Sequence, residues 1–131
     1  MALSPEILRA IGCQRRVHEE IRDLIHSEIP AQQLSILYYV AENEGAPQGE
    51  IAKALQMPQA TVSRNIAKLA VKMEENREKK PVDTGYGLLV NRNDTAEPRR
   101  LCVFLTPKGQ EVLKSIAKAV LNNCNRLLDQ P

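Results

Sequence analysis

The sequence has few aromatic residues and no long apolar run. Aromatic residues make up 3% of its 131 residues and tryptophan is absent, yet 43% of the residues are hydrophobic. We therefore expect one domain, residues 1–131, with a mostly aliphatic core. Because no apolar run is long enough to cross a bilayer and the first residues do not form a secretory signal, we expect a soluble, cytoplasmic protein without membrane contact.

Motifs for metal binding and catalysis are also missing. The three cysteines show no CxxC spacing, and the two histidines stand eight residues apart, too far to hold one metal ion as an i,i+4 pair. The sequence contains no glycine-rich phosphate loop, no GxSxG motif and no cluster of carboxylates with histidine in a plausible catalytic setting. We predict that the chain is not an enzyme and that it uses no cofactor or metal ion.

The net charge of +2 is unevenly distributed. Residues 1–47 hold four Lys or Arg against seven Asp or Glu, whereas residues 48–108 hold eleven against seven. The basic excess in the middle of the chain favours an anionic partner. Ordinary scatter of surface charge is the alternative.

Helical spacing dominates the first part of the sequence. Ser4-Pro5-Glu6 is a helix start, with a cap, proline at the first position and an acid near the positive end. Apolar residues continue this helix over about 5–28, before Pro30. Two shorter helices are expected over about 31–44 and 49–56.

The fourth expected helix begins with QATVSRNIAKL, residues 59–69. Apolar residues form one stripe at a spacing of 4, 3, 4, and polar residues form a second stripe at the same spacing. The apolar stripe is Val62, Ile66, Leu69 and Met73, and the polar stripe is Thr61, Asn65, Lys68 and Lys72. We expect this helix to continue through the charged run EENREKK (74–80) and to stop at Pro81.

The character of the sequence changes after Pro81. YGLLVNR (86–92) and RRLCVFL (99–105) are rich in Leu and Val, and the turn-forming NDTAEP lies between them, which predicts a β-hairpin with a basic tip. Thr106-Pro107 begins a final helix with the Thr as its cap. The apolar residues of this helix are Leu113, Ile116, Val120, Leu121, Cys124, Leu127 and Leu128.

Two short helices joined by a tight break, the second of them small, polar and basic, predict a helix-turn-helix. The N-terminal part of a recognition helix enters the DNA major groove, where Gln and Asn bond adenine and Arg bonds guanine. Gln59, Ser63 and Arg64 occupy that part of the fourth helix. A solvated polar face is the alternative, and the spacing alone leaves both interpretations open.

The hairpin favours DNA recognition. A basic two-stranded element directly after a recognition helix is a wing, and an arginine at its tip can enter a narrow minor groove. Arg92, Arg99 and Arg100 flank this tip. The alternative is an edge hairpin whose charges prevent aggregation.

The first and last helices are longer than a small winged helix needs. We predict that they form a dimer interface, which would place two recognition helices about one DNA turn, roughly 34 Å, apart. In the alternative, both helices fold back on their own monomer.

The sequence resembles the MarR family of winged helix-turn-helix transcriptional regulators. The similarity runs over about residues 33–113, and its most specific pieces are TVSR in the fourth helix and LTPKG after the wing. The resemblance implies a mainly α fold with a small β-hairpin, in which a winged helix-turn-helix (about 31–105, wing near 86–105) is flanked by long dimerisation helices at about 5–29 and 107–128. It also implies a homodimer that represses or activates transcription at pseudo-palindromic double-stranded operators. In the family this regulation is often relieved by a small-molecule effector or by thiol oxidation.

The resemblance carries over to individual positions. Four residues match DNA-contacting positions of the fourth helix, and two more lie near them: Gln59, Thr61, Ser63 and Arg64, then Asn65 and Lys68. In the wing, Arg99 matches the tip arginine, with Arg92 and Arg100 beside it. The acid that is thought to orient this arginine in the family is Glu97 here.

Three features depart from the family pattern. Met57-Pro58 replaces a Ser or similar residue near the start of the recognition helix, and Pro98 stiffens the wing tip. The largest departure is about 14 extra residues, roughly 73–86, before Gly87. These residues put the usual docking of the wing in doubt.

Some relatives sense peroxide through a cysteine in the first helix near tyrosines of the second, and Cys13, Tyr38 and Tyr39 occupy such positions. A reactive cysteine needs a lowered pKa and exposure. Arg15 and Arg16 are near in sequence, but we do not expect helical geometry to aim them at Cys13. Packing as a small apolar residue is the favoured alternative. The other cysteines are also predicted to pack: Cys102 and Cys124.

The leading hypothesis is a sequence-specific, homodimeric DNA-binding regulator, with repression as the favoured direction. A second hypothesis keeps the fold and assigns a replication or partition role on a mobile element, which the extra residues motivate. A third is a winged-helix module that binds another protein and no DNA.

Overall fold

The computed structural model describes residues 2–71, 73–83 and 85–128, with side chains except at residues 73, 74, 82, 83 and 126–128. The chain divides into two compact units, which we call the helical unit (Met1–Ile29 with Glu111–Pro131) and the winged unit (Pro30–Gln110). The single domain over residues 1–131 stays a prediction.

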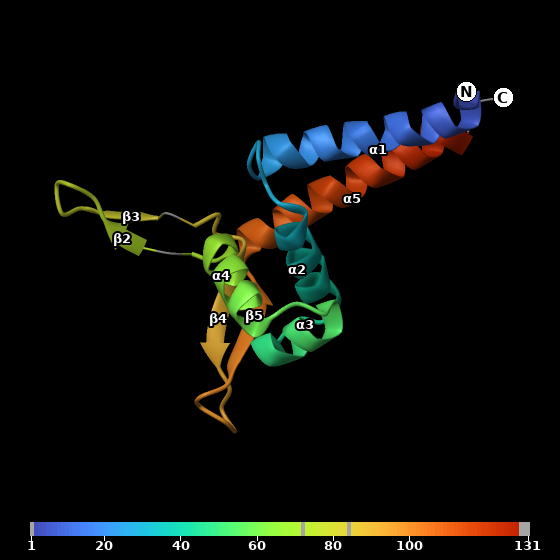
Figure 1. Cartoon of the computed structure of the whole chain (residues 1–131). Coiled ribbons are helices and arrows are strands. Elements are labelled where there is room, and N and C mark those ends of the chain that lie inside the picture. The colour runs from blue at the N-terminus through green and yellow to red at the C-terminus, as the bar shows by residue number, and fades with distance from the viewer. Residues whose placement is uncertain (1, 72, 84, 129–131) are drawn as a thin grey trace. The chain divides into compact units, whose positions relative to one another are not determined.

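The helical unit consists of two helices that run side by side and antiparallel: α1 (Pro5–Leu24) and α5 (Pro107–Leu128), the latter from residue 111 on (Figure 1). Val17 and Ile21 of α1 are buried. None of the helices among the described residues has the length and apolar character of a membrane-spanning segment.

The first helix is shorter than predicted, because it ends at Leu24 instead of near residue 28. Proline at position 30 disfavours a helical conformation for Ile29, so the chain must leave the helix before it. The turn that follows is closed by Arg22, whose Nε donates a 2.7 Å hydrogen bond to the carbonyl of Ser27.

The winged unit combines three helices with a three-stranded antiparallel sheet of order β1-β5-β4 (Figure 1). The helices are α2 (Ala31–Glu42), α3 (Gln48–Leu55) and α4 (Gln59–Leu69). The strands are β1 (Ala46–Pro47), β4 (Leu89–Asn93) and β5 (Leu101–Leu105). The predicted winged helix-turn-helix fold is therefore confirmed.

The core of this unit is aliphatic, as the composition predicts. Full burial of a Leu, Ile or Val side chain contributes about 1.5–3 kcal/mol to the free energy of folding. Such residues from both the helices and the sheet stabilise the unit. The largest fully buried side chains that the structure describes are Ile36, Leu37, Val40, Ile51, Val62, Ile66, Leu69, Leu88, Leu89 and Val103.

The sheet is one strand larger than the predicted hairpin. β4 and β5 pair as expected, with Leu89 opposite Leu105. The segment predicted only as a break also pairs, because Ala46 lies opposite Val103 and Pro47 opposite Cys102. This third strand joins the start of α3 to the wing.

The prediction that the fourth helix continues to Pro81 is wrong. α4 ends at Leu69, and the charged run lies in a second hairpin made of β2 (Met73–Glu75) and β3 (Pro81–Asp83). Met73 therefore does not extend the apolar stripe. Lys72, predicted for the polar stripe, lies outside the described residues.

Two features account for the end of α4, one of them a long-range contact and the other a local turn. Ala70 has extended backbone angles and forms a bridge with Leu89, so the chain enters sheet pairing directly after the helix. In the hairpin, the Asn76 side-chain oxygen accepts hydrogen bonds from the backbone N–H groups of Glu78 and Lys80, both at 2.9 Å. Such asparagine turns compete with helix formation, and here tertiary pairing outweighs local helix propensity.

The extra residues form an excursion from the winged unit, and the chain returns to the carboxyl end of α4, where the excursion began. The N–H of Tyr86 donates to the carbonyl of Lys68 (2.9 Å), and the N–H of Leu88 donates to that of Leu69 (2.8 Å). A Cβ atom at Gly85 would collide with the Ala70 carbonyl oxygen, so this approach requires glycine. The insertion therefore leaves the wing attached to the end of α4.

The predicted cap of the last helix is confirmed. The hydroxyl of Thr106 accepts a 2.9 Å hydrogen bond from the N–H of Gly109 and donates a 2.6 Å hydrogen bond to the carbonyl of Gly87. The start of α5 is thereby fixed to the segment that precedes β4.

Candidate nucleic-acid interface

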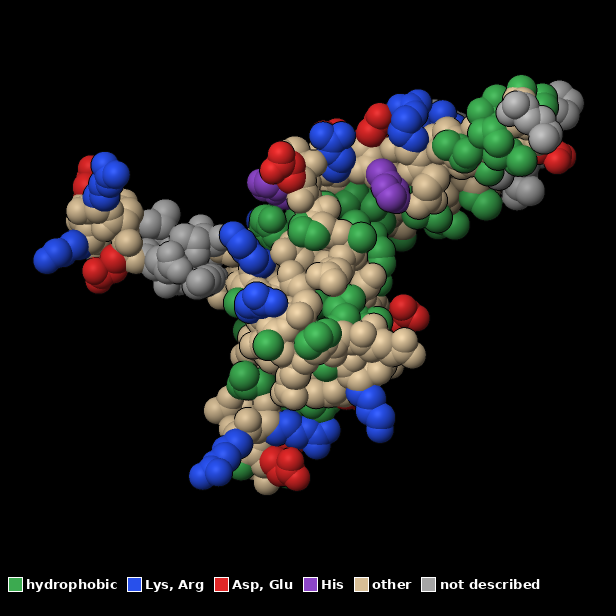
Figure 2. All heavy atoms as spheres, in the orientation of Figure 1, with side chains coloured by type: hydrophobic (Ala, Val, Ile, Leu, Met, Phe, Trp, Pro, Cys, Tyr) green, Lys and Arg blue, Asp and Glu red, His purple; other side chains and the backbone are tan. Residues whose placement is uncertain are grey.

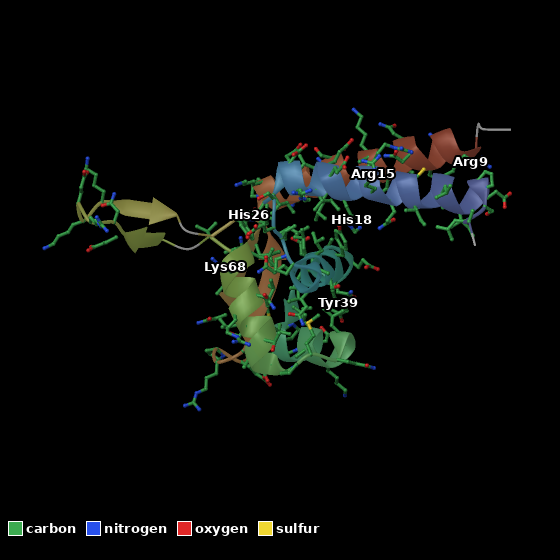
Figure 3. All side chains as sticks on the ribbon, turned by 45° about the horizontal axis from the view of Figure 1, so that its top comes forward. Arg9, Arg15, His18, His26, Tyr39 and Lys68 are labelled. Atoms are coloured by element: carbon green, nitrogen blue, oxygen red, sulfur yellow. The ribbon has the colours of Figure 1, made fainter. Side chains whose placement is uncertain are left out.

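The two faces of α4 are separated as its spacing predicts. Val62, Ile66 and Leu69 have 0% exposure and anchor the helix in the winged unit. Four predicted contact residues are exposed on its outer side, and Figure 3 labels the last of them: Gln59, Ser63, Arg64 and Lys68.

The remaining two predicted residues of α4 are only half-exposed: Thr61 and Asn65. The Oδ1 atom of Asn65 accepts a 3.2 Å hydrogen bond from Nε2 of Gln33 on α2. Asn65 therefore already has a partner inside the winged unit.

The tip of the wing is a compact turn organised by Asp94. Its Oδ1 accepts a hydrogen bond from the N–H of Ala96, and its own N–H donates to the carbonyl of Arg100, both at 2.9 Å. Lys and Arg side chains gather over this tip in Figure 2. The turn places Arg99 and Arg100 at the start of the returning strand.

The two wing-tip arginines differ in their partners. Nη1 of Arg100 lies 3.8 Å from an Asp94 carboxylate oxygen and 4.0 Å from one of Glu97. The resemblance implies that Glu97 orients Arg99, but in the structure Glu97 faces Arg100. Within the described part of the chain Arg99 makes no ion pair.

Arg92 is exposed on β4, and its guanidinium carbon lies 5.2 Å from the centre of the Phe104 ring. This cation–π contact holds the side chain against the neighbouring strand. Nearby, Nε2 of Gln48 donates a 2.9 Å hydrogen bond to Oδ1 of Asn91, which ties the first turn of α3 to the wing.

An open hollow of about 420 Å³ lies between α3, α4 and the wing. It brings together three of the predicted DNA-binding residues: Gln59, Arg99 and Arg100. The other lining residues are Pro47, Gln48, Gly49, Glu50 and Leu101.

The first turn of α3 was absent from the predicted site. Gln48, Gly49 and Glu50 are far from residue 99 in sequence, and only the pairing of β1 with β5 brings the two regions together. A two-residue strand containing proline carries little sequence signal.

Cys13 is half-buried in the helical unit and has polar neighbours. Its Sγ lies 3.5 Å from the carbonyl oxygen of Asn123 and 3.5 Å from Nη2 of Arg16, which also donates from Nε to Oδ1 of Asn123 (2.9 Å). The expectation that Arg16 is not aimed at Cys13 is wrong, because residues at i and i+3 share a helix face. Arg15 pairs with Glu19 instead.

The other cysteines and the two tyrosines are placed as follows. Cys102 is half-buried, whereas Cys124 is exposed in the single chain, so the prediction that Cys124 packs is wrong for the monomer. Tyr38 and Tyr39 are half-buried on α2, and burial raises the pKa of Tyr38 above its ordinary value of 10.0.

Comparisons with known proteins bear on the family and the fold. Residues 27–72 match the sequence model of the MarR family. The structure of a MepR mutant from S. aureus bound to an oligodeoxyribonucleotide aligns with a TM-score of 0.67 and 22% identity, covering 100% of this chain and 86% of that one. The chain is MarR-like in sequence and in fold.

Two other solved structures share this fold. RV1404 from Mycobacterium tuberculosis aligns with a TM-score of 0.74 and 14% identity, covering 100% of this chain and 84% of that one. A mutant MarR from E. coli complexed with operator DNA aligns with a TM-score of 0.63 and 16% identity, covering 92% of this chain and 74% of that one. No curated protein matches the chain in sequence.

Proposed function

We propose that this MarR-like chain is a sequence-specific regulator of transcription that binds double-stranded DNA as a homodimer and represses at pseudo-palindromic operators. The recognition helix α4 enters the major groove, and the wing enters the adjacent minor groove. A small-molecule effector that relieves binding is part of this proposal by family resemblance.

One observation carries the proposal. The amino end of α4 exposes Gln59, Ser63 and Arg64 beside a wing whose Arg99 lines the same hollow as Gln59. Gln and Arg are residue types that read base edges, and an exposed wing arginine suits a narrow minor groove.

Two further features support it. The similar MepR and MarR mutant structures contain an oligodeoxyribonucleotide and operator DNA respectively. In the helical unit, large apolar side chains remain exposed on both helices, as a dimer interface would require, including Leu8 and Leu121.

The first test is selection of bound sequences from a random duplex pool. We expect enrichment of a two-fold symmetric site whose halves are about one helical turn, roughly 34 Å, apart. Binding should weaken steeply with rising salt, because phosphate contacts release counterions. Recovery of no preferred sequence would contradict sequence-specific recognition.

Substitutions test the assignment of the grooves on the selected site. Arg64→Ala should cost about 1–3 kcal/mol of binding free energy and relax the preference at one base pair. Arg99→Ala should reduce the preference for a narrow minor groove in the flanking sequence. Arg77→Ala, which removes an exposed arginine from the β2–β3 hairpin, is the control. Unchanged binding by both test variants would refute the groove assignment.

The same material separates the other hypotheses. A gel shift with random duplex at low salt that shows no complex at micromolar protein would favour a protein-binding module. If a duplex is bound, genome-wide mapping of bound sites distinguishes promoters, which a transcriptional regulator occupies, from a replication origin.

A further inference from the structure

The hollow between α3, α4 and the wing has both polar and apolar walls, and the side chains that line it carry a net positive charge. Gln48 and Gln59 contribute amides, and Arg99 and Arg100 contribute two positive charges against the single carboxylate of Glu50. Only Pro47 and Leu101 contribute larger apolar surfaces. Arginine binds phosphate through charge-assisted hydrogen bonds, so the two arginines in this lining suit a phosphate.

The position of the hollow specifies where such a phosphate would come from. In the proposed function, Gln59 faces a major groove and Arg99 the adjacent minor groove. These two grooves are separated by one sugar-phosphate backbone. Any backbone that runs between the helix and the wing must therefore cross the hollow, which both residues line.

We propose that the hollow binds one DNA backbone phosphate, which Arg100 contacts directly and Glu50 repels, so that Glu50 lowers the affinity for DNA. This inference rests on the proposed function, and it assigns different tasks to the neighbouring arginines. Arg99 reaches the minor groove, whereas Arg100 neutralises the backbone and fixes the register of the protein on the duplex.

Arg100 suits this task because its present ion pairs are weak. Its distances to Asp94 and Glu97 are 3.8 and 4.0 Å, and all three side chains are partly exposed to water. Exposed pairs of this kind contribute little, so Arg100 can exchange them for a bidentate contact with a phosphate.

Glu50 acts in the opposite direction. It lies in the first turn of α3, where a carboxylate stabilises the positive end of the helix. The same carboxylate lines the hollow and repels a phosphate seated there. Replacing it by glutamine should therefore tighten DNA binding while slightly destabilising α3.

The experiment measures binding to two duplexes, the selected site and a scrambled sequence, over a series of salt concentrations. Arg100→Ala should weaken binding to both duplexes by a similar factor and reduce the salt slope by about one. Glu50→Gln should tighten binding to both by roughly two- to tenfold at low salt, with a smaller gain at high salt. Arg77→Ala and Glu42→Gln, at exposed positions away from the hollow, are the matched controls.

A backbone scan then locates the phosphate. Single methylphosphonates, which remove one charge each, are placed along the selected duplex. At one position per half-site, neutralisation should weaken wild-type binding, should have no further effect on Arg100→Ala, and should abolish the gain of Glu50→Gln. Thermal melts of each variant confirm that it folds.

The outcomes are separable. Failure of the wild-type protein to bind any duplex would overturn the proposed function itself. Binding by the wild type with no uniform loss in Arg100→Ala, or no gain in Glu50→Gln, would overturn only the phosphate seat. Inorganic phosphate replacing chloride at equal ionic strength is the last arm. If it lowers the affinity of the wild type more than that of Arg100→Ala, the free anion competes for the proposed seat, as we expect, whereas an equal effect on both proteins contradicts the seat.

Discussion

A pair of side-chain amides joins the recognition helix to α2. Gln33 is 5% exposed, its Nε2 bonds Asn65, and its Oε1 has no hydrogen-bond partner among the described residues. A buried acceptor without a partner costs about 1–3 kcal/mol, whereas the hydrogen bond to Asn65 contributes about 1 kcal/mol. Replacing Gln33 itself should therefore change the stability of the protein less than removing its partner, Asn65.

Two substitutions distinguish these effects. Asn65→Ala leaves the whole Gln33 amide buried without its partner and should lower the free energy of unfolding by about 1–3 kcal/mol. Gln33→Leu removes the unpartnered oxygen together with the bond and should change stability by less than about 1 kcal/mol. Urea denaturation followed by circular dichroism measures both. Equal losses in the two variants would show that the amide pair is not organised in this way.

The same pair shows what helical spacing can predict at the scale of single residues. The period of α4 correctly separated buried Val62 and Ile66 from exposed Ser63 and Arg64. It could not show that Asn65, at the border between the two faces, meets a side chain from α2. Periodicity gives the direction of a side chain but not the neighbour it finds there.

At the scale of elements, the β2–β3 hairpin is an appendage whose two ends meet. Val71 donates its N–H to the carbonyl of Leu89, and Tyr86 donates its own to Lys68. The charged run was predicted to extend the fourth helix as far as Pro81, whereas the side chain of Asn76 organises a turn within it. Sheet pairing of Ala70 with Leu89, a long-range contact, decided the outcome.

Because its ends meet, the hairpin should be removable. Replacing residues 73–83 by Gly-Gly should preserve the fold, with a melting temperature within a few degrees of the wild type, because the fully buried side chains that the structure describes lie outside the hairpin. DNA affinity should stay within about twofold, since the attachment of the wing to α4 does not use these residues. Calorimetry and a binding titration check this.

A single substitution at the junction provides the contrasting control. Gly85→Ala keeps the hairpin but places a Cβ atom against the Ala70 carbonyl oxygen. We expect it to be more destabilising than removal of the whole hairpin. A stable Gly85→Ala variant alongside an unfolded deletion variant would mean that the hairpin itself holds the wing in place.

At the scale of the whole molecule, the helical unit leaves apolar surface uncovered. Exposed side chains occur on both helices: Ile7, Leu8, Ile11, Val120 and Leu121, with exposures from 46% to 63%. A surface of this kind is typical of an interface, and the proposed homodimer would cover it.

Adjacent residues of α5 allow a matched test of the dimer. Leu121→Glu introduces a charge into the exposed apolar surface and should shift the protein from dimer to monomer in sedimentation experiments. Asn122→Glu, one position further along α5 and also exposed, should leave the assembly unchanged. The monomeric variant should lose high-affinity binding to the two-fold site, because half-sites are then bound singly. A wild-type monomer would contradict the proposal.

The candidate site was predictable only in part at this scale. The sequence places Gln59 on a helix and Arg99 and Arg100 on a wing, and the structure brings all three to one hollow. The contribution of Gln48, Gly49 and Glu50 depends on β1, whose pairing with β5 joins segments more than 50 residues apart. Local patterns do not contain that information.

Because the two ends of the β2–β3 hairpin meet near Gly85, this position is also suited to the insertion of another folded protein. Wherever two ends of a surface excursion lie side by side, a folded reporter whose own termini are close can replace the excursion without stretching the host. A fluorescent protein inserted in place of residues 73–83 would stand beside the carboxyl end of the recognition helix. Its emission would then report locally on what happens at the groove.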